Sequence, residues 1–305
     1  MNGAAAAVGR FAPSPSGPLH FGSLVAALGS FLAARAAGGS WRLRIEDIDT
    51  PRVVPGAADD ILRTLEAFGL HWDGAVMYQS RRGDAYQAVL DKLLADGLAY
   101  PCSCSRKDIA AVAGASLLYP GLCRRGPRQP RHPLAVRLHT DDTPIGFADR
   151  IQGPYQQRLA TAVGDFVIRR ADGLFAYQLA VVVDDAAQGV TQVVRGADLL
   201  DSTPRQIWLQ RLLGLPTPEY AHLPLALDRN GQKLSKSSQA PAVERRHPVP
   251  ALVAALRFLG HAPPAELRAA PPAELLDWAR CHWQWAHIPR DPAAPPALRS
   301  LADPA

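Results

Sequence analysis

The sequence predicts an α/β protein in which helices cover a parallel sheet. Strand-like and helix-like segments alternate over residues 8–95, and the alternation resumes after residue 165. Acidic side chains stand at the end of one predicted strand, where open α/β sheets place ligand-binding groups. The 305 residues are 48% hydrophobic, which suffices for one large core and a second, smaller one.

The composition narrows the class of protein further. The longest apolar stretch, residues 24–37, is interrupted by Gly29, Ser30 and Arg35 and is too short to span a membrane. No basic residue precedes the apolar residues 4–8, so we expect no signal peptide. Four cysteines are too few for a disulfide framework in a chain of this size, and we expect a cytoplasmic protein without membrane contact.

The net charge of +5 favours an anionic partner only mildly. Basic residues gather at 124–132 and again at 245–247. Each run is as compatible with a solvated loop as with a nucleic-acid contact, so the remaining motifs must identify the partner.

The segment from Arg10 to Ser23 is the first candidate for a binding site. Its prolines and glycines delay the start of a helix until the apolar pattern that begins at Phe21 and ends before the glycines at 38 and 39. The free N–H groups of that helix would favour an anion in the preceding turn. A predicted strand over 41–45 follows and ends in the acids of residues 46–49.

The remaining segments continue the alternation, apart from residues 101–165, which we interpret as an insertion with strand-like pieces near 134–138 and 147–151. Residues 171–173 predict a hairpin turn. Ser202 or Thr203 should cap the helix predicted over residues 203–213. Further helices are predicted at 56–68, 84–95, 177–187, 203–213, 249–259 and 273–285, and further strands at 190–194 and 222–227.

Two cationic segments lie near the start of the predicted sheet and after its last strand in the sequence. His20 alone would more often be a helix cap, and the lysines of residues 233–237 alone would more often be a solvated loop. Together they offer two separated cationic arms, which is what a bound triphosphate requires when charge develops on its oxygens.

These motifs carry a resemblance to a known family. PLHFGS at 18–23 and KLSKS at 233–237 resemble the HIGH and KMSKS signatures of class I aminoacyl-tRNA synthetases. RFAPSPSGPLHFG at 10–22 and LRIEDID at 43–49 resemble the glutamyl branch of that class. The resemblance spans about residues 8–240 and includes GLHWDG at 69–74, GLFAYQLAVVVDD at 173–185 and GVTQVVRGADLL at 189–200.

The resemblance implies a specific domain organisation. A Rossmann-type catalytic domain with a parallel sheet would occupy residues 1–100 and 166–240, interrupted by a zinc-bearing insertion over 101–165. Residues 241–290 would form a small all-helical domain like a stem-contact domain, and the Pro- and Ala-rich residues 291–305 a disordered tail.

The resemblance also implies an activity. The residues after 240 are too few for the anticodon-binding domain of a glutamyl-tRNA synthetase, so the chain is most similar to a shortened branch of that family. Members of that branch activate L-glutamate with ATP and Mg²⁺, without tRNA, and transfer it to queuosine in the anticodon of tRNA(Asp). The alternatives are a truncated glutamyl-tRNA synthetase that charges the 3′ end of tRNA(Glu) and a catalytically silent RNA-binding paralogue. We expect a monomer.

The roles of single residues are also implied by the resemblance. His20 and Lys236 would be catalytic, and a serine, Ser23, stands where HIGH has its second histidine. From the residues alone, Glu46 could equally be a strand-end ion pair, Tyr177 a core side chain and Arg195 a partner of Asp198. The implied glutamate-binding residues are Arg10, Phe11, Ala12, Pro13, Ser14, Glu46, Tyr177 and Arg195, and the implied ATP-binding residues are His20, Gly22, Ser23, Lys233 and Lys236.

The cysteines of the insertion predict a structural zinc site. Cys102 and Cys104 form a C-x-C pair, and Cys123 follows in a loop too polar to bury itself. His132 or His139 would be the ordinary fourth ligand, whereas the resemblance implies Tyr119. We expect the remaining cysteine, Cys281, to be packed in a helical core.

Overall fold

The central sheet of the computed structural model is parallel and has the doubly wound strand order. Strands β1, β2 and β3 pair in that order, and β9 and β10 pair in the same parallel sense. The N–H of Thr191 donates to the carbonyl of Val8 at 3.0 Å, so β1 and β9 lie side by side and the two groups adjoin. The strands are β1 (Val8–Phe11), β2 (Ser40–Ile45), β3 (Met77–Tyr78), β9 (Gln192–Gly196) and β10 (Glu219–Leu223). The predicted parallel sheet is confirmed.

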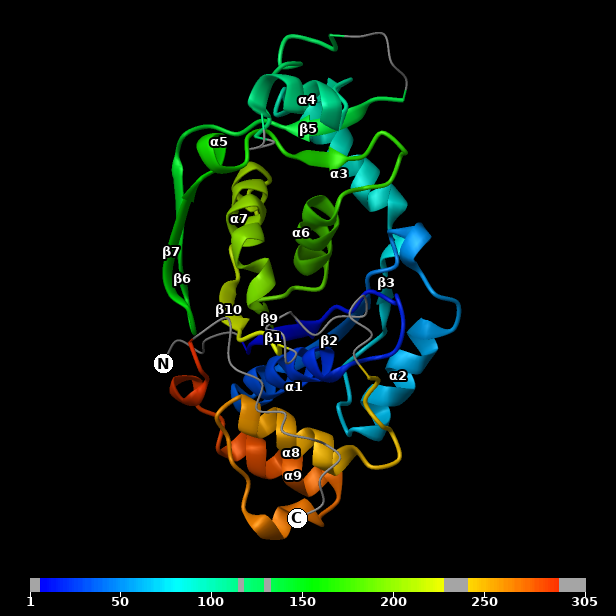
Figure 1. Ribbon diagram of the computed structural model, residues 1–305, viewed down its shortest axis with the longest axis vertical. Helices are drawn as coiled ribbons and strands as arrows, with labels where there is room; N and C mark the ends of the chain where they lie inside the picture. Colours follow the sequence, from blue (N-terminus) through cyan, green and yellow to red (C-terminus); the bar gives the residue numbers. More distant parts are fainter. Residues whose placement is uncertain (1–5, 115–117, 129–132, 228–240, 291–305) are drawn as a thin grey trace.

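The structure describes residues 6–114, 118–128, 133–227 and 241–290 (Figure 1). The predicted KLSKS loop, His132 and the predicted tail at 291–305 lie outside these ranges. Within them, no helix is both long and apolar enough to cross a membrane.

Helix α1 (Phe21–Ala36) is the centre of the larger core. Its residues Leu24, Leu28 and Leu32 recur at every fourth position and are fully buried, as the apolar spacing predicts. Figure 1 shows α1 between the sheet and the helices near the C-terminus, α8 (Pro248–Phe258) and α9 (Pro272–Cys281). These two helices share a continuous apolar core with α1, which fixes them to the sheet.

A second core lies on the other face of the sheet. It contains apolar side chains of α3 (Gly83–Ala95), α6 (Tyr177–Ala187) and α7 (Thr203–Leu212). The Tyr86 hydroxyl of α3 donates to the buried carboxylate of Asp184 in α6 at 2.6 Å, which ties these two helices together. Helix α2 (Ala57–Ala67) contributes Ile61 and Leu65 to the larger core instead.

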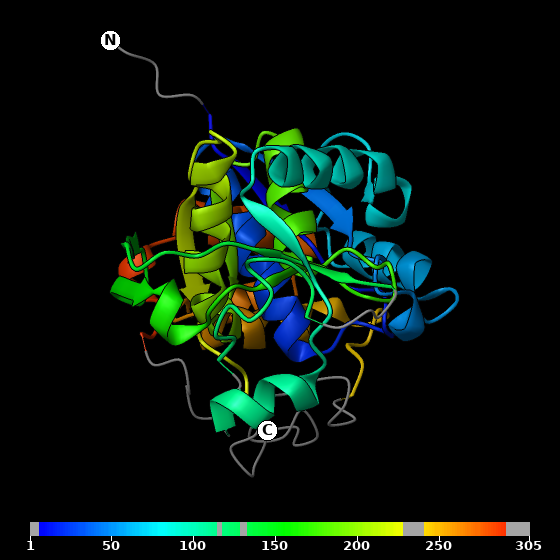
Figure 2. The ribbon, with the colours of Figure 1, turned by 90° about the horizontal axis from the view of Figure 1, so that it is seen from above.

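The first part of the segment predicted as an insertion lies at one end of the long axis of the molecule, whereas its hairpin at residues 144–158 runs back to the central sheet (Figure 1). Strands β4 (Ala99–Cys102), β5 (Ala135–Leu138) and β8 (Val167–Arg169) form an antiparallel sheet there. Helix α4 (Arg106–Ala113) lies at the margin of the molecule in the view from above (Figure 2).

A hairpin connects this segment to the central sheet. Strand β6 (Pro144–Asp149) pairs with β7 (Gly153–Arg158) along its length and, at Asp149, with β10. The strand predicted near 147–151 corresponds to β6, which begins and ends earlier, whereas β7 was not predicted. Alternate side chains of β7 are exposed and its sequence, GPYQQR, offers little apolar alternation to detect.

Other boundaries differ from the predictions for local reasons. Strand β10 starts earlier than predicted and ends at Leu223, because Pro224 has no N–H for the ladder. Neither Ser202 nor Thr203 caps α7 through its side chain, since a 3₁₀ turn (Ala197–Ser202) leads directly into the helix. Cys281, predicted to be packed in a core, is exposed.

Candidate active site

A cavity of about 700 Å³ opens at the carboxyl ends of β1 and β9. This is the point at which the strand order reverses, where open α/β sheets bind their ligands. Its lining includes Phe11, Pro13, Ser14, His20, Gly22, Ser23, Gly196 and Asp198. The structure therefore gathers much of the predicted segment from Arg10 to Ser23 around one cavity, together with the end of β9.

His20 forms the junction between this segment and α1. It is the N-cap of α1, and its Nδ1 accepts from the backbone N–H of Ser23 at 3.3 Å. The first turn of α1 contains no acidic side chain, so the positive end of the helix dipole faces the cavity without a carboxylate of its own. This arrangement favours an anion such as a phosphate group.

A second group of predicted residues meets beside the cavity around two buried arginines. The Arg10 Nε donates to Asp185 at 3.2 Å, and the Arg44 Nη1 donates to the same carboxylate oxygen at 2.8 Å. The Arg44 Nη2 lies 3.3 Å from Glu46. Only 3% of Arg10 and none of Arg44 is exposed, so the two guanidinium groups depend on these carboxylates for charge compensation.

The two carboxyl groups respond to this environment in opposite ways. Burial acts to raise the pKa of Asp185, but Arg10 and Arg44 outweigh it and hold the pKa below its usual range. Burial also raises the pKa of Glu46, and there the attraction of Arg44 and Arg10 does not compensate. Asp185 is therefore the fixed counter-ion of the arginines, whereas Glu46 is the carboxylate that lacks a full cationic partner.

Tyr177 and Arg195 belong to the same cluster of polar side chains. The Arg195 Nη1 donates to the Tyr177 hydroxyl at 3.3 Å, from the end of β9 to the start of α6. Burial raises the pKa of Tyr177, and the charges of Arg195, Glu46 and Arg10 also act on it. These four predicted residues thus lie within electrostatic range of one another.

Of the remaining predicted residues, Ala12 is half-buried between Phe11 and Pro13. Lys233 and Lys236 lie outside the described residues. Sequence reasoning missed Arg44 and Asp185 as part of the pocket. The available signal was that each lies among apolar residues of a predicted strand or helix next to one other charge, in WRLRI or LAVVVDDA.

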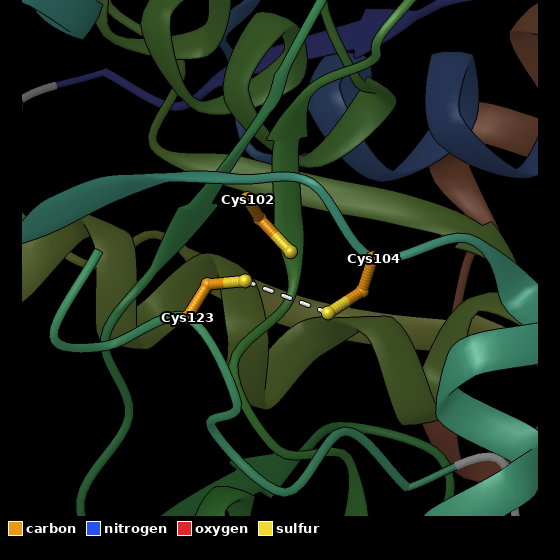
Figure 3. Close-up of side chains that lie close together, drawn as sticks. All are labelled: Cys102, Cys104 and Cys123. Atoms are coloured by element: carbon orange, nitrogen blue, oxygen red, sulfur yellow. Dashed lines mark hydrogen bonds between the residues drawn. The ribbon is translucent and has the colours of Figure 1, made fainter. Parts of the chain in front are cut away.

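The three cysteines of the insertion form a compact cluster (Figure 3). The sulfur atoms of Cys102, Cys104 and Cys123 lie within 4.8 Å of one another, and those of Cys104 and Cys123 are 3.5 Å apart. The Tyr119 hydroxyl lies 3.3 Å from the Cys102 sulfur and 3.9 Å from the Cys104 sulfur. His139, in contrast, packs against Tyr100 in a tilted arrangement, with ring centroids 4.5 Å apart, and is not part of the cluster.

The geometry and charge of this cluster fit a tetrahedral metal ion. Sulfur ligands about 2.3 Å from zinc lie roughly 3.8 Å from one another, close to the observed spacing. Burial acts to raise the pKa of Cys123, but hydrogen bonds from the backbone of Ser103 and Arg128 and from neighbouring side chains lower it to about 6. Burial and the hydrogen bond with Cys123 raise the pKa of Cys104 to about 12. The Arg137 Nε donates to the Cys102 sulfur at 3.3 Å.

Comparison with known proteins gives a consistent result. The family described as "tRNA synthetases class I (E and Q), catalytic domain" matches residues 7–266. The chain is 58% identical over 283 residues to the Glutamyl-Q tRNA(Asp) synthetase of Ectopseudomonas mendocina, covering 93% of this chain and 95% of that protein. It is 57% identical over 293 residues to the protein of the same name from Geobacter sulfurreducens, covering 92% and 93% of the two chains.

Solved structures show the same fold. A glutamate tRNA ligase from Elizabethkingia meningosepticum, in complex with its amino acid, has a TM-score of 0.75 and 25% sequence identity. The match covers 93% of this chain and 66% of that one. The Glutamate-tRNA Synthetase of Elizabethkingia anophelis has a TM-score of 0.74 at the same identity, with 93% and 67% covered.

Proposed function

This chain belongs to the family of class I tRNA synthetases for glutamate and glutamine, and from that premise we propose that it is a ligase that glutamylates queuosine in the anticodon of tRNA(Asp). The observation that carries the proposal is the cluster of Arg10, Glu46, Tyr177 and Arg195, whose chain neighbours Phe11 and Gly196 line a cavity at the N-terminus of α1. The relatives named Glutamyl-Q tRNA(Asp) synthetase match nearly the full chain, which supports queuosine as the acceptor.

The glutamate pocket has a role for each charged group. The segment Arg10–Ser14 would frame the pocket, with the Arg10 guanidinium attracting the side-chain carboxylate of the substrate. Glu46 would accept hydrogen bonds from the substrate ammonium, which supplies the cationic partner that this carboxylate lacks. Tyr177 and Arg195 would close the pocket from α6 and β9.

The first reaction step would take place between this pocket and the cavity. The α-carboxylate of glutamate attacks the α-phosphorus of ATP, and pyrophosphate leaves with the electron pair of the broken P–O bond. Negative charge that develops on the phosphate oxygens would be stabilised by His20, the N–H of Gly22 and the hydroxyl of Ser23, with Lys233 and Lys236 as further cationic groups. Each such donor contributes roughly 3 kcal/mol in a water-poor site. ATP would carry Mg²⁺ as its counter-ion.

The second step would use the glutamyl-adenylate as acyl donor. A hydroxyl of the queuosine cyclopentene ring attacks the glutamyl carbonyl, forms an ester and releases AMP. We propose that this takes place in a cytoplasmic monomer with the domain boundaries predicted from the sequence.

The activity is tested by following labelled glutamate. The protein should catalyse glutamate-dependent exchange of pyrophosphate into ATP without tRNA, and the label should appear on tRNA(Asp) only when queuosine is present. Exchange that requires tRNA, with label at the 3′ end of tRNA(Glu), would instead identify a truncated glutamyl-tRNA synthetase. The absence of both reactions would favour a catalytically silent RNA-binding paralogue.

We also propose that Cys102, Cys104, Cys123 and Tyr119 hold one structural zinc ion, which would cross-link β4 to the following loop. The purified protein should contain about one equivalent of zinc, and Cys104→Ser should contain about none, because three remaining ligands bind zinc much more weakly. Cys281→Ser is the matched control and should keep its zinc, since this thiol is exposed and outside the cluster. Less than about half an equivalent in the parent protein would contradict the site.

A further inference from the structure

A buried chain of hydrogen bonds leads from the β6–β7 hairpin to the glutamate pocket. The Asp149 Oδ2 lies 2.6 Å from the His222 Nδ1, and the His222 Nε2 lies 3.1 Å from the Arg195 Nε. None of these residues is more than 5% exposed. They come from three strands, β6, β10 and β9, so only the folded sheet brings them together.

The donors of Arg195 determine the tautomer of His222. The Arg195 Nε carries one hydrogen and a guanidinium has no acceptor, so the His222 Nε2 must be the acceptor in this contact. The imidazole is then neutral and carries its proton on Nδ1, from which it donates to Asp149. The Asp149 carboxylate therefore acts on Arg195 through the imidazole ring.

The Asp149 carboxylate is itself held in one orientation. Its Oδ1 accepts from the backbone N–H groups of Ile151 at 3.0 Å, Gln152 at 2.9 Å and His222 at 3.1 Å. These donors leave Oδ2 for the imidazole. The β6–β7 turn therefore fixes the carboxylate as well as ending the strand.

The other N–H groups of Arg195 are engaged as well. Its Nη2 donates to the Thr203 hydroxyl at 2.9 Å and to the Leu199 carbonyl at 3.4 Å, and its Nη1 donates to the Tyr177 hydroxyl. Of the five N–H groups of a guanidinium, these partners and His222 use four, so within the described residues one Nη1 hydrogen remains for a ligand. The direction in which this Nη1 hydrogen points depends on the orientation of the guanidinium plane of Arg195.

We propose that Asp149 and His222 are positioning residues, which hold the Arg195 guanidinium in the plane that binds glutamate. Asp149 selects the imidazole tautomer, and the Nε2 of that tautomer anchors the Nε side of the guanidinium. The inference rests on the proposed function of Arg195 as part of the glutamate pocket. It assigns a role to the hairpin at residues 144–158 that no motif in the sequence indicated.

Asp149→Asn tests the tautomer directly. The amide oxygen should take the place of Oδ1, because three backbone N–H groups point there, so the amide NH₂ must face His222. The imidazole then accepts on Nδ1 and presents an Nε2–H to the Nε–H of Arg195, where the Thr203 hydroxyl oxygen, 3.2 Å from Nε2, is the other neighbour among the described residues. Two facing donors repel, and we expect the KM for glutamate to rise roughly 10- to 100-fold in pyrophosphate exchange, with the KM for ATP changed by less than about 2-fold.

Further variants separate positioning from a general structural effect. His222→Gln keeps an acceptor near the Nε2 position and should raise the KM for glutamate less than His222→Leu does. In an Arg195→Ala background Asp149→Asn should add no further loss, because the residue through which it acts is gone. Glu219→Gln, a change of an exposed carboxylate on β10, is the matched control and should leave both KM values unchanged.

The outcomes distinguish this inference from the proposed function. A parent protein without glutamate-dependent exchange would refute the proposed function itself. An active parent in which Asp149→Asn leaves the KM for glutamate unchanged, or raises both KM values equally, would overturn only the positioning role. Additive losses in the double variant would overturn it too. Thermal melting identifies a variant that fails to fold, and in that case the comparison of His222→Gln with His222→Leu decides.

Discussion

Glu46→Gln should lower kcat/KM for glutamate by at least about 100-fold in pyrophosphate exchange and at the same time stabilise the fold. The loss follows because a charged hydrogen bond to the substrate ammonium in a buried site is worth roughly 3 kcal/mol. The gain follows because burial raises the pKa of Glu46, so the ionised carboxylate costs stability in the free protein. The amide keeps the shape of the side chain and can still accept from Arg44.

The pH dependence of this effect has a definite sign. An unfolded glutamate ionises near pH 4.5, whereas the folded Glu46 ionises at a higher pH. Between the two values the native state binds more protons, so its stability falls as the pH rises. The free energy of unfolding of Glu46→Gln should therefore begin to exceed that of the parent above pH 4.5, and the difference should become constant once the pH exceeds the raised pKa of Glu46. The kcat/KM of the parent should fall as the pH is lowered through that same pKa.

Asp47→Asn is the control for this prediction. Asp47 is the next acid along the chain, and it accepts from the N–H and hydroxyl of Ser80 at 2.8 and 2.6 Å rather than facing the pocket. We expect it to change kcat/KM for glutamate by less than about 3-fold. A Glu46→Gln protein that is less stable than the parent at neutral pH, or that keeps the parental KM for glutamate, would contradict the role assigned to Glu46.

The elements with strong local signals were predicted from the sequence. The apolar run over residues 177–187 coincides with α6, because the helix is buried along most of its length and Gly189 adopts φ +65° just beyond it. The strands β9 and β10 were predicted near their positions, but the predicted ends differ from the observed ends by a few residues. Pairing between strands sets their ends, and a single segment contains no information about its partner.

The residues of the active site also include some that were predicted from the sequence and some that were missed. The HIGH-like segment, Glu46, Tyr177 and Arg195 were predicted through motifs. The structure places the HIGH-like segment along the cavity and brings Tyr177 and Arg195 into contact, with Glu46 among their electrostatic neighbours. Asp149 and His222 were missed, because they are 73 positions apart and neither lies in a recognised motif. Asp185 was also missed as a site residue, since its partner Arg44 is 141 positions away and only the folded chain shows that the two charges compensate each other.

Asp185→Asn should destabilise the protein by about 3–5 kcal/mol, measured as the free energy of unfolding in denaturant at neutral pH. The carboxylate serves two buried guanidinium groups, those of Arg10 and Arg44, and an amide removes the ion-pair partner of Arg10 and leaves Glu46 as the one carboxylate paired with Arg44 among the described residues. The Nε of Arg44 already lacks a hydrogen-bond partner among the described residues, and without Asp185 the guanidinium keeps only the neutral Gln188 amide oxygen at 2.8 Å and Glu46 at 3.3 Å. We also expect the KM for glutamate to rise, because Arg10 loses the partner that orients it.

Asp184→Asn is the control on the same helix. Asp184 is equally buried, but it accepts from Gln79, Arg82 and Tyr86 on the α3 side. Its replacement should therefore lower the stability while leaving the KM for glutamate unchanged. Equal effects of the two variants on that KM would show that both act through general loosening of α6, and would contradict a specific role for Asp185.

The pH dependence provides an independent test of Asp185, with the sign opposite to that of Glu46. Because the pKa of Asp185 is lowered in the folded protein, its contribution to stability is complete above the unfolded value of 3.8 and is lost as the pH falls through the folded pKa. The stability difference between the parent and Asp185→Asn should thus be constant near neutrality and shrink only below about pH 4. Asp185 thus compensates the charges of the two arginines, whereas Glu46 lacks a full cationic partner until the substrate ammonium binds.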